Sequence, residues 1–188
     1  MATREQATVT KWTIDPAHTL VEFEARHMML TKVRGRFADV SGELIVDEAN
    51  PENSRVEVEI DARSIDTRSS DRDTHLRSED FLDVERYPKV TFRSKRVEGA
   101  HAEPGDEFQL IGDLTIRDQT REVVLDCRYE GQGTDPWGGT RAGFNATTKV
   151  DRRDWGLTWN QALETGGVLV SHELKVELEV QAVRQQDG

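Results

Sequence analysis

The sequence contains very little cysteine: Cys127 is the only one in 188 residues. An internal disulfide is therefore excluded, and a chain of this length, which buries about 70% of its unfolded surface as one domain, does not need one. No run approaches the roughly 18 apolar residues of a spanning helix, which predicts no integral membrane segment. The first residues, MATREQATVTKW, lack an apolar stretch and a cleavage pattern, so we expect no signal peptide and a cytoplasmic location.

Basic charge is also scarce. The chain has 25 Lys and Arg against 36 Asp and Glu, a net charge of −11 at pH 7, and no run of basic residues stands out. A like-charged surface cannot release counterions from phosphates, which argues against nucleic acid and against anionic membranes as partners. We interpret the acidity as a solvated surface that keeps the protein in solution.

Catalytic and metal-binding motifs are missing. The five histidines show no HExxH or HxH spacing, and there is no GxSxG elbow or glycine-rich phosphate loop before a helix. Cys127 lies within an apolar strand face, where a thiol is usually an inert small hydrophobe. The sequence therefore predicts no metal site, no catalytic residues and no required cofactor.

What the chain does have is alternation of apolar and charged residues with a period of two. It runs through residues 21–27, 56–60, 108–116, 123–129, 142–150 and 174–182. Strands with one apolar and one charged face are typical of antiparallel sheets. About eight strands joined by short connections are typical of a β-sandwich or an up-and-down barrel. The uninterrupted apolar face on each long strand favours the barrel, so we predict an all-β fold of eight antiparallel strands closed into a barrel. The predicted single domain covers residues 11–183, between tails at 1–10 and 184–188.

One segment breaks this pattern. Residues 71–92, DRDTHLRSEDFLDVERYPKVTF, predict a short helix that Asp71 or Asp73 caps, and their proline prevents the helix from continuing. Leu76 and Phe81 would give the helix an apolar side. A single helix in an all-β chain is unsuited to a sheet, so we interpret it as a lid or plug.

Several residues on the inward faces are small: Ala25, Gly112, Ala142, Ala146 and Ala182. A core packed solid needs larger side chains, so these positions are consistent with a partly open lumen. The alternative is that bulkier facing residues fill the gaps. His27 is in phase with the inward face and is either a core histidine or a polar anchor inside an apolar lumen.

Tryptophans and arginines lie near strand ends. Trp12, Trp137, Trp155 and Trp159 suit a barrel mouth, where an indole can be half-buried, or end packing. Arg72 and Arg152 belong to compact charged clusters. They either decorate the surface or, if buried at the mouth, contact a polar head group.

The chain resembles the YceI-like family, the polyisoprenoid-binding, lipocalin-like proteins, from Trp12 to Val183. The resemblance rests on the order and spacing of short pieces: WTIDPAH at 12–18, HM at 27–28, SIDT at 64–67, RDTHL at 72–76, DF at 80–81, YP at 87–88, GDLTI at 112–116 and RRDWG at 152–156. Asp118 departs from the glycine that many relatives carry. The resemblance implies an eight-stranded lipocalin-like barrel whose lumen holds the isoprenoid tail of a quinone or polyprenyl lipid, and it allows a homodimer.

Alternation and resemblance together predict the site. The predicted lumen lining comprises Val21, Phe23, Ala25, His27, Phe37, Val58, Ile60, Leu76, Phe81, Phe92, Leu114, Ile116, Phe144, Ala146, Val176 and Leu178. The predicted mouth or latch residues are Arg72, Asp73, His75, Trp137, Arg152 and Trp155. The leading hypothesis is a carrier or store of an apolar lipid that performs no catalysis.

Two alternatives stay open at this point. One is an enzyme that acts on a small apolar substrate in the same cavity with His27 or His75 as general acid or base, which needs a second polar group within reach. The other is a stress-related binding module whose barrel is filled by its own side chains.

Overall fold

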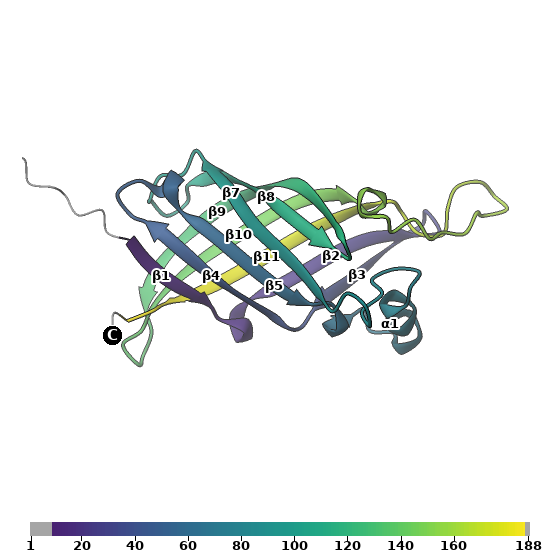
Figure 1. The fold of residues 1–188 in the computed structure, drawn as a ribbon, viewed down its shortest axis with the longest axis horizontal. Helices are drawn as coiled ribbons and strands as arrows, with labels where there is room; N and C mark the ends of the chain where they lie inside the picture. The colour runs from purple at the N-terminus through teal and green to yellow at the C-terminus, as the bar shows by residue number, and fades with distance from the viewer. Residues whose placement is uncertain (1–8, 187–188) are drawn as a thin grey trace, which may run out of the picture.

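Antiparallel strands close into a ring in the computed structural model, which describes residues 9–186 (Figure 1). The ring consists of β1 (Val9–Ile14), β4 (Val40–Asp47), β5 (Arg55–Asp61), β7 (Lys89–Glu98), β8 (Glu107–Ile116), β9 (Gln119–Thr134), β10 (Thr140–Asp151) and β11 (Glu173–Arg184), and pairing of β1 with β11 closes it. The predicted eight-stranded antiparallel barrel is confirmed. Closure leaves these strands without the unpaired edges that promote aggregation.

Three further strands extend the sheet beyond the ring. They are β2 (Leu20–His27), β3 (Thr31–Phe37) and β6 (Ile65–Asp66). β2 pairs with the first half of β11 and β1 with its last residues, so both share one neighbour. The short 3-10 helix η1 (Pro16–His18) separates them, and Asp15 caps it by accepting from the Ala17 N–H. The remaining 3-10 helices are η2 (Pro51–Asn53), η3 (Ala62–Ser64) and η4 (Arg152–Trp155).

A separate apolar cluster fills the end of the barrel opposite α1. Its buried members are Trp12, Ile14, Leu44, Ala142 and Ala182. Trp12 is only 2% exposed, and its indole N–H donates to Thr10 Oγ1 at 2.9 Å, so burying the polar atom costs little. This packing closes one end of the barrel.

The small inward residues mostly make room for large neighbours. Ala142 and Ala182 pack in the cluster that contains Trp12. The ring of Phe92 lies against Gly112, where an added Cβ would sit 2.5 Å from Phe92 Cζ. At these three positions bulky neighbours fill the gaps, so these residues do not argue for an open lumen.

Replacing Gly112 with alanine is expected to destabilise the barrel by about 2 kcal/mol, because the new Cβ would also approach the Arg93 carbonyl oxygen to 2.5 Å. Urea unfolding measures the effect. Gly133→Ala is the matched control, since an added Cβ there meets nothing within 4 Å. Equal stability of the two variants would contradict this description of the wall.

The predicted helix exists but is shorter than its segment. Helix α1 spans Ser70–Arg77, and Ser69 caps it by accepting from the Arg72 N–H, so the prediction that Asp71 or Asp73 caps it was wrong. Phe81 is buried but lies in the turns that follow, which hydrogen bonds such as Leu82 N–H to Leu76 O hold together. The helix ends well before the proline because these turns compete with it.

The predicted boundaries fall close to the ends of the described residues. β1 begins at Val9, within the stretch predicted as a tail, and β11 ends at Arg184. The rest of the predicted tails, residues 1–8 and 187–188, lies outside the described residues. Within residues 9–186 no helix is long and apolar enough to cross a membrane.

Candidate functional site

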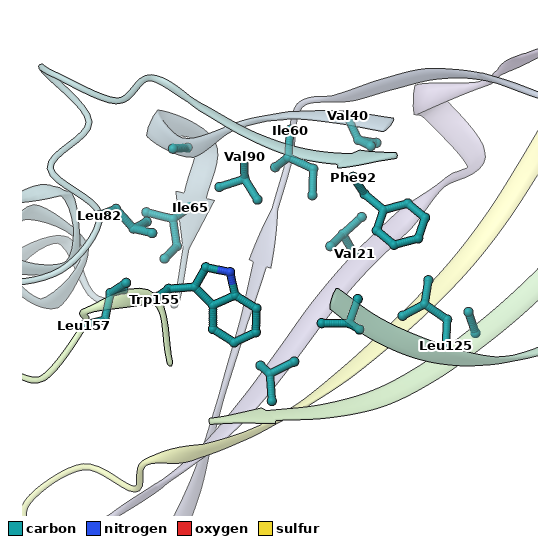
Figure 2. Packing of buried hydrophobic residues seen from close by; sticks show 14 of the residues in the cluster. Val21, Val40, Ile60, Ile65, Leu82, Val90, Phe92, Leu125, Trp155 and Leu157 are labelled. Carbon is teal, nitrogen blue, oxygen red and sulfur yellow. The ribbon is translucent and has the colours of Figure 1, made fainter. Parts of the chain in front are cut away.

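Apolar side chains from most strands meet inside the barrel. All predicted lining residues except Ala25 and His27 belong to the two interior clusters, as buried members or packed against them. Figure 2 shows Val21, Ile60 and Phe92 approaching the same interior from different strands, with Trp155 nearby. The strand alternation therefore brings most of the predicted lining together.

Part of this inward surface is not fully buried. On β11 the charged residues face outward and are exposed, while the inward Leu174, Val176 and Leu178 are half-buried. Leu114 on β8 is also half-buried. A core packed to native density would bury such side chains almost completely, so these side chains are not packed on all sides.

Three rings cover the end of the barrel at α1. The His75 ring lies edge-on to Trp159 at 4.5 Å and to Phe81 at 5.1 Å, and Phe81 lies 5.3 Å from Trp159, measured between ring centroids. We call Leu76, Phe81 and Trp159 together with α1 the lid. The lid joins the helical segment to the segment after η4, so two distant parts of the chain close the same end.

Polar contacts fasten the lid to the barrel. The Asp73 carboxylate is buried and accepts from both the N–H and the hydroxyl of Thr67, at 2.9 and 2.5 Å. Arg72 donates to the Thr67 hydroxyl and carbonyl oxygens at 2.7 and 2.6 Å. His75 Nε2 lies 2.8 Å from an Asp80 carboxylate oxygen. Arg72 and Asp73 therefore hold α1 to the residue that follows β6, whereas the contact of His75 lies within the helical segment.

Arg152 organises the other half of the lid. It is 4% exposed, and its guanidinium donates to the carbonyl oxygens of Leu157, Trp159, Val170 and Ser171 at 2.8 to 3.2 Å. Within residues 9–186 it forms no ion pair with a carboxylate. Burial lowers the pKa of Arg152, and the four carbonyl dipoles stabilise its charge. This side chain therefore holds the two ends of the segment 157–171 together.

The two predicted mouth tryptophans lie at opposite ends. Trp155 is 2% exposed and donates its indole N–H to the Leu114 carbonyl oxygen at 2.9 Å. Trp137 is 85% exposed in the turn between β9 and β10, at the barrel end away from α1 (Figure 1). Trp137 therefore does not lie with the other mouth residues, because the β9–β10 hairpin points the opposite way.

The two histidines of the enzyme hypothesis occupy different surroundings. His27 ends β2, where its backbone bridges to Val170, and no side-chain hydrogen bond is formed by it within the described residues. His75 has Asp80 as a partner, but its ring packs in the lid. Within residues 9–186 no polar side chain is hydrogen-bonded to His27, as an acid–base pair would require. Across residues 9–186, no three His, Cys, Asp or Glu side chains are grouped to hold a metal ion.

A hollow of about 350 Å³ lies on the outer surface. Its lining includes Asp39, Glu59, Asp61, Arg63 and Lys89. The barrel interior, where most of the predicted lining residues gather, is the candidate site.

Comparison with known proteins identifies the family. The model of the YceI-like domain matches residues 12–182. The chain belongs to the YceI-like family. Protein YceI of Salmonella newport (strain SL254) is 37% identical over 168 residues, which cover 89% of this chain and 83% of that protein.

Solved structures share the YceI-like fold. The crystal structure of Burkholderia cenocepacia BcnA matches with a TM-score of 0.76 at 20% identity, covering 89% of this chain and 98% of that one. A polyisoprenoid binding domain from Saccharophagus degradans, implicated in plant cell wall breakdown, matches with a TM-score of 0.68 at 12% identity, covering 93% and 98%. At these identities the two likenesses show the fold alone.

The single thiol of this YceI-like barrel is unreactive by position. Cys127 is buried on the inner face of β9, and desolvation, followed by the nearby Asp126 charge, raises its pKa to about 12. We expect Cys127 to resist alkylation by iodoacetamide at pH 8 in the folded protein and to react fully in urea, because the thiolate is the nucleophile. Mass spectrometry measures the labelling. Rapid labelling of the folded protein would contradict the burial of Cys127.

Sequence reasoning missed two contributors to the lid. Trp159 was named among the tryptophans that suit a barrel mouth but was not among the predicted site residues, and Thr67 was noted only as part of a motif. Neither carries a local signal, because their partners Phe81 and Asp73 come from other segments. In the sequence, only the polar residues around the helix indicated that the helix is fastened by side-chain contacts.

Proposed function

We propose that this chain binds and carries or stores an isoprenoid lipid, of quinone or polyprenyl type, inside the barrel without catalysis. The observation that carries the proposal is the half-buried apolar lining, which lies between an end closed by Trp12 and an end covered by the lid. The polyisoprenoid binding domain with the same fold supports this choice of ligand class.

The lining favours a long apolar chain over a compact polar one. Burial of each methylene yields about 0.8 kcal/mol gross, so each five-carbon unit adds a few kcal/mol before ordering costs reduce it. The proposed lining is the predicted set, with Ala25 and His27 nearest the open tip of β2 rather than in the packed interior. Selectivity for the head group would come from the lid region.

Uptake of matched quinones tests this proposal. A quinone with an isoprenoid tail and the same head group without the tail are titrated separately while tryptophan fluorescence is followed. We expect saturable binding of the tailed compound and at least about tenfold weaker binding of the bare head group. Equal affinity would assign recognition to the head group and contradict a lumen that holds the tail.

Location and assembly are separate proposals. We propose a cytoplasmic location, which cell fractionation tests. The homodimer that the family resemblance allows is tested by light scattering on the purified chain.

A further inference from the structure

The turn between β2 and β3 exposes the longest run of large apolar side chains on the described surface. Met28, Met29 and Leu30 are 43%, 54% and 75% exposed, whereas the other large hydrophobics exposed within residues 9–186, Val9, Val124 and Trp137, are isolated from one another in sequence. We call residues 26–34 the hairpin tip. Isolated exposed hydrophobics are ordinary, but three in a row on one turn need an explanation.

The backbone of the tip is held in an uncommon conformation. Met28 and Met29 have φ of 52° and 60°, and Leu30 N–H donates to the His27 carbonyl oxygen at 3.0 Å, which makes a tight hairpin turn with both central residues left-handed. Asn-Gly is the favoured pair in such turns. Two methionines make the turn less stable than Asn-Gly would, and they place two apolar side chains at its apex.

Cations flank these apolar residues. Residues 25–34, ARHMMLTKVR, contain three basic residues and no acidic one in a chain of net charge −11. The side chains of Lys32 and Arg34 are 53% and 72% exposed, although both also approach Glu24, at 3.5 and 3.1 Å. Arg26 is exposed and forms no ion pair within the described residues.

The tip lies beside the lid. Figure 1 shows the β2–β3 turn at the barrel end that carries α1. Met28 N–H donates to the Leu169 carbonyl oxygen at 2.8 Å, and His27 bridges to Val170, whose carbonyl accepts from Arg152. A short chain of contacts therefore links the tip to the residues that hold the lid closed.

We propose that the hairpin tip docks on an anionic lipid bilayer, with Met28, Met29 and Leu30 entering the headgroup region and Arg26, Lys32 and Arg34 facing the lipid charges. This inference rests on the proposed lipid-carrying function, because it places the lid beside the source of the ligand. Charge complementarity selects the partner, since apolar side chains ringed by cations match an anionic interface. The overall acidity does not prevent docking: the Debye length is about 8 Å at physiological salt, whereas the twelve residues of β11 alone extend about 40 Å.

Vesicle flotation tests the proposal with a variant that keeps the turn. Met28→Asn combined with Met29→Gly supplies the favoured turn pair, so the variant is expected to be at least as stable as the parent chain. We expect the parent chain to float with phosphatidylcholine vesicles that contain phosphatidylglycerol, and the double variant to bind about tenfold or more weakly. Trp137→Ser, which removes an exposed apolar side chain at the opposite end, is the matched control and should bind like the parent chain.

Charge and ligand are tested separately. Lys32→Ser with Arg34→Ser should weaken flotation about tenfold, and added salt should weaken that of the parent chain. Uptake of a detergent-solubilised isoprenoid quinone should be unchanged in the tip variants, so failure of docking is distinguishable from failure of the carrier function. The proposal would be overturned if the parent chain failed to float, or if it bound equally well to pure phosphatidylcholine vesicles. It would also be overturned if the parent chain were a dimer and the Met28→Asn, Met29→Gly variant a monomer, because the tip would then be the contact with a second copy of the chain.

Discussion

Replacing Arg152 with methionine is expected to lower the free energy of unfolding by about 3 kcal/mol or more. The side chain is buried, and its removal leaves up to four carbonyl oxygens without their donor, each of which costs roughly 1–3 kcal/mol if water cannot replace it. Methionine preserves most of the apolar volume of the side chain, so the loss of stability measures the contribution of the hydrogen bonds. Urea unfolding followed by circular dichroism measures it.

The neighbouring Arg153 is the matched control. Its guanidinium pairs with the Asp151 carboxylate at 2.6 Å on the surface and lowers the pKa of Asp151 to about 2. An exposed pair contributes about 0–1 kcal/mol, so Arg153→Met should cost little. Equal destabilisation by the two substitutions would contradict the central position given to Arg152.

Loss of Arg152 should also loosen the lid. Arg152 holds the Trp159 carbonyl oxygen, and the Trp159 ring packs on Phe81 and His75. A loosened lid raises the dissociation rate of a bound lipid. Under conditions where Arg152→Met remains folded, a dissociation rate equal to that of the parent chain would mean that the lid does not retain the ligand.

Replacing Ala146 with tryptophan is expected to abolish lipid uptake while leaving the fold intact. Ala146 lies on the inner face of β10, opposite Leu178 and Cys127 on the neighbouring strands. An indole at this position would occupy space that the proposal gives to the isoprenoid tail. We expect affinity for a tailed quinone to fall by about a hundredfold or more, from loss of several buried methylenes.

The stability of the same variant distinguishes an open lumen from a filled one. In a filled core the extra volume costs about 1–3 kcal/mol, whereas in an open lumen the ring is accommodated at little cost. Thr147→Trp places the same side chain on the exposed outer face and controls for surface effects. Strong destabilisation by Ala146→Trp with no loss of uptake would favour the filled binding module over the carrier.

Period-two alternation predicted antiparallel strands with one apolar and one polar face, and it favoured a barrel over a sandwich without excluding the sandwich. Val176 and Leu178 were assigned to the interior for this reason, and both lie there. The break between β1 and β2 could not be predicted, since it depends on how two strands share β11. The small residues were misleading, because an alanine or glycine beside Trp12 or Phe92 marks close packing rather than empty space.

The lid could be predicted only in part from the sequence. The helix and its apolar residues were visible locally, whereas the Ser69 cap, the Arg152 carbonyl contacts and the Trp159 contact depend on tertiary structure. Trp137 was grouped with the mouth because aromatic residues near strand ends look alike in sequence. Only the direction of the β9–β10 hairpin separates them.

Organic extraction of the purified chain, followed by mass spectrometry, tests the central claim most directly. The extract of the parent chain should contain an isoprenoid lipid in near-equimolar amount, and the extract of Ala146→Trp prepared in parallel should lack it. An extract with no apolar ligand, from a chain that also takes up no added quinone or polyprenol, would contradict the account.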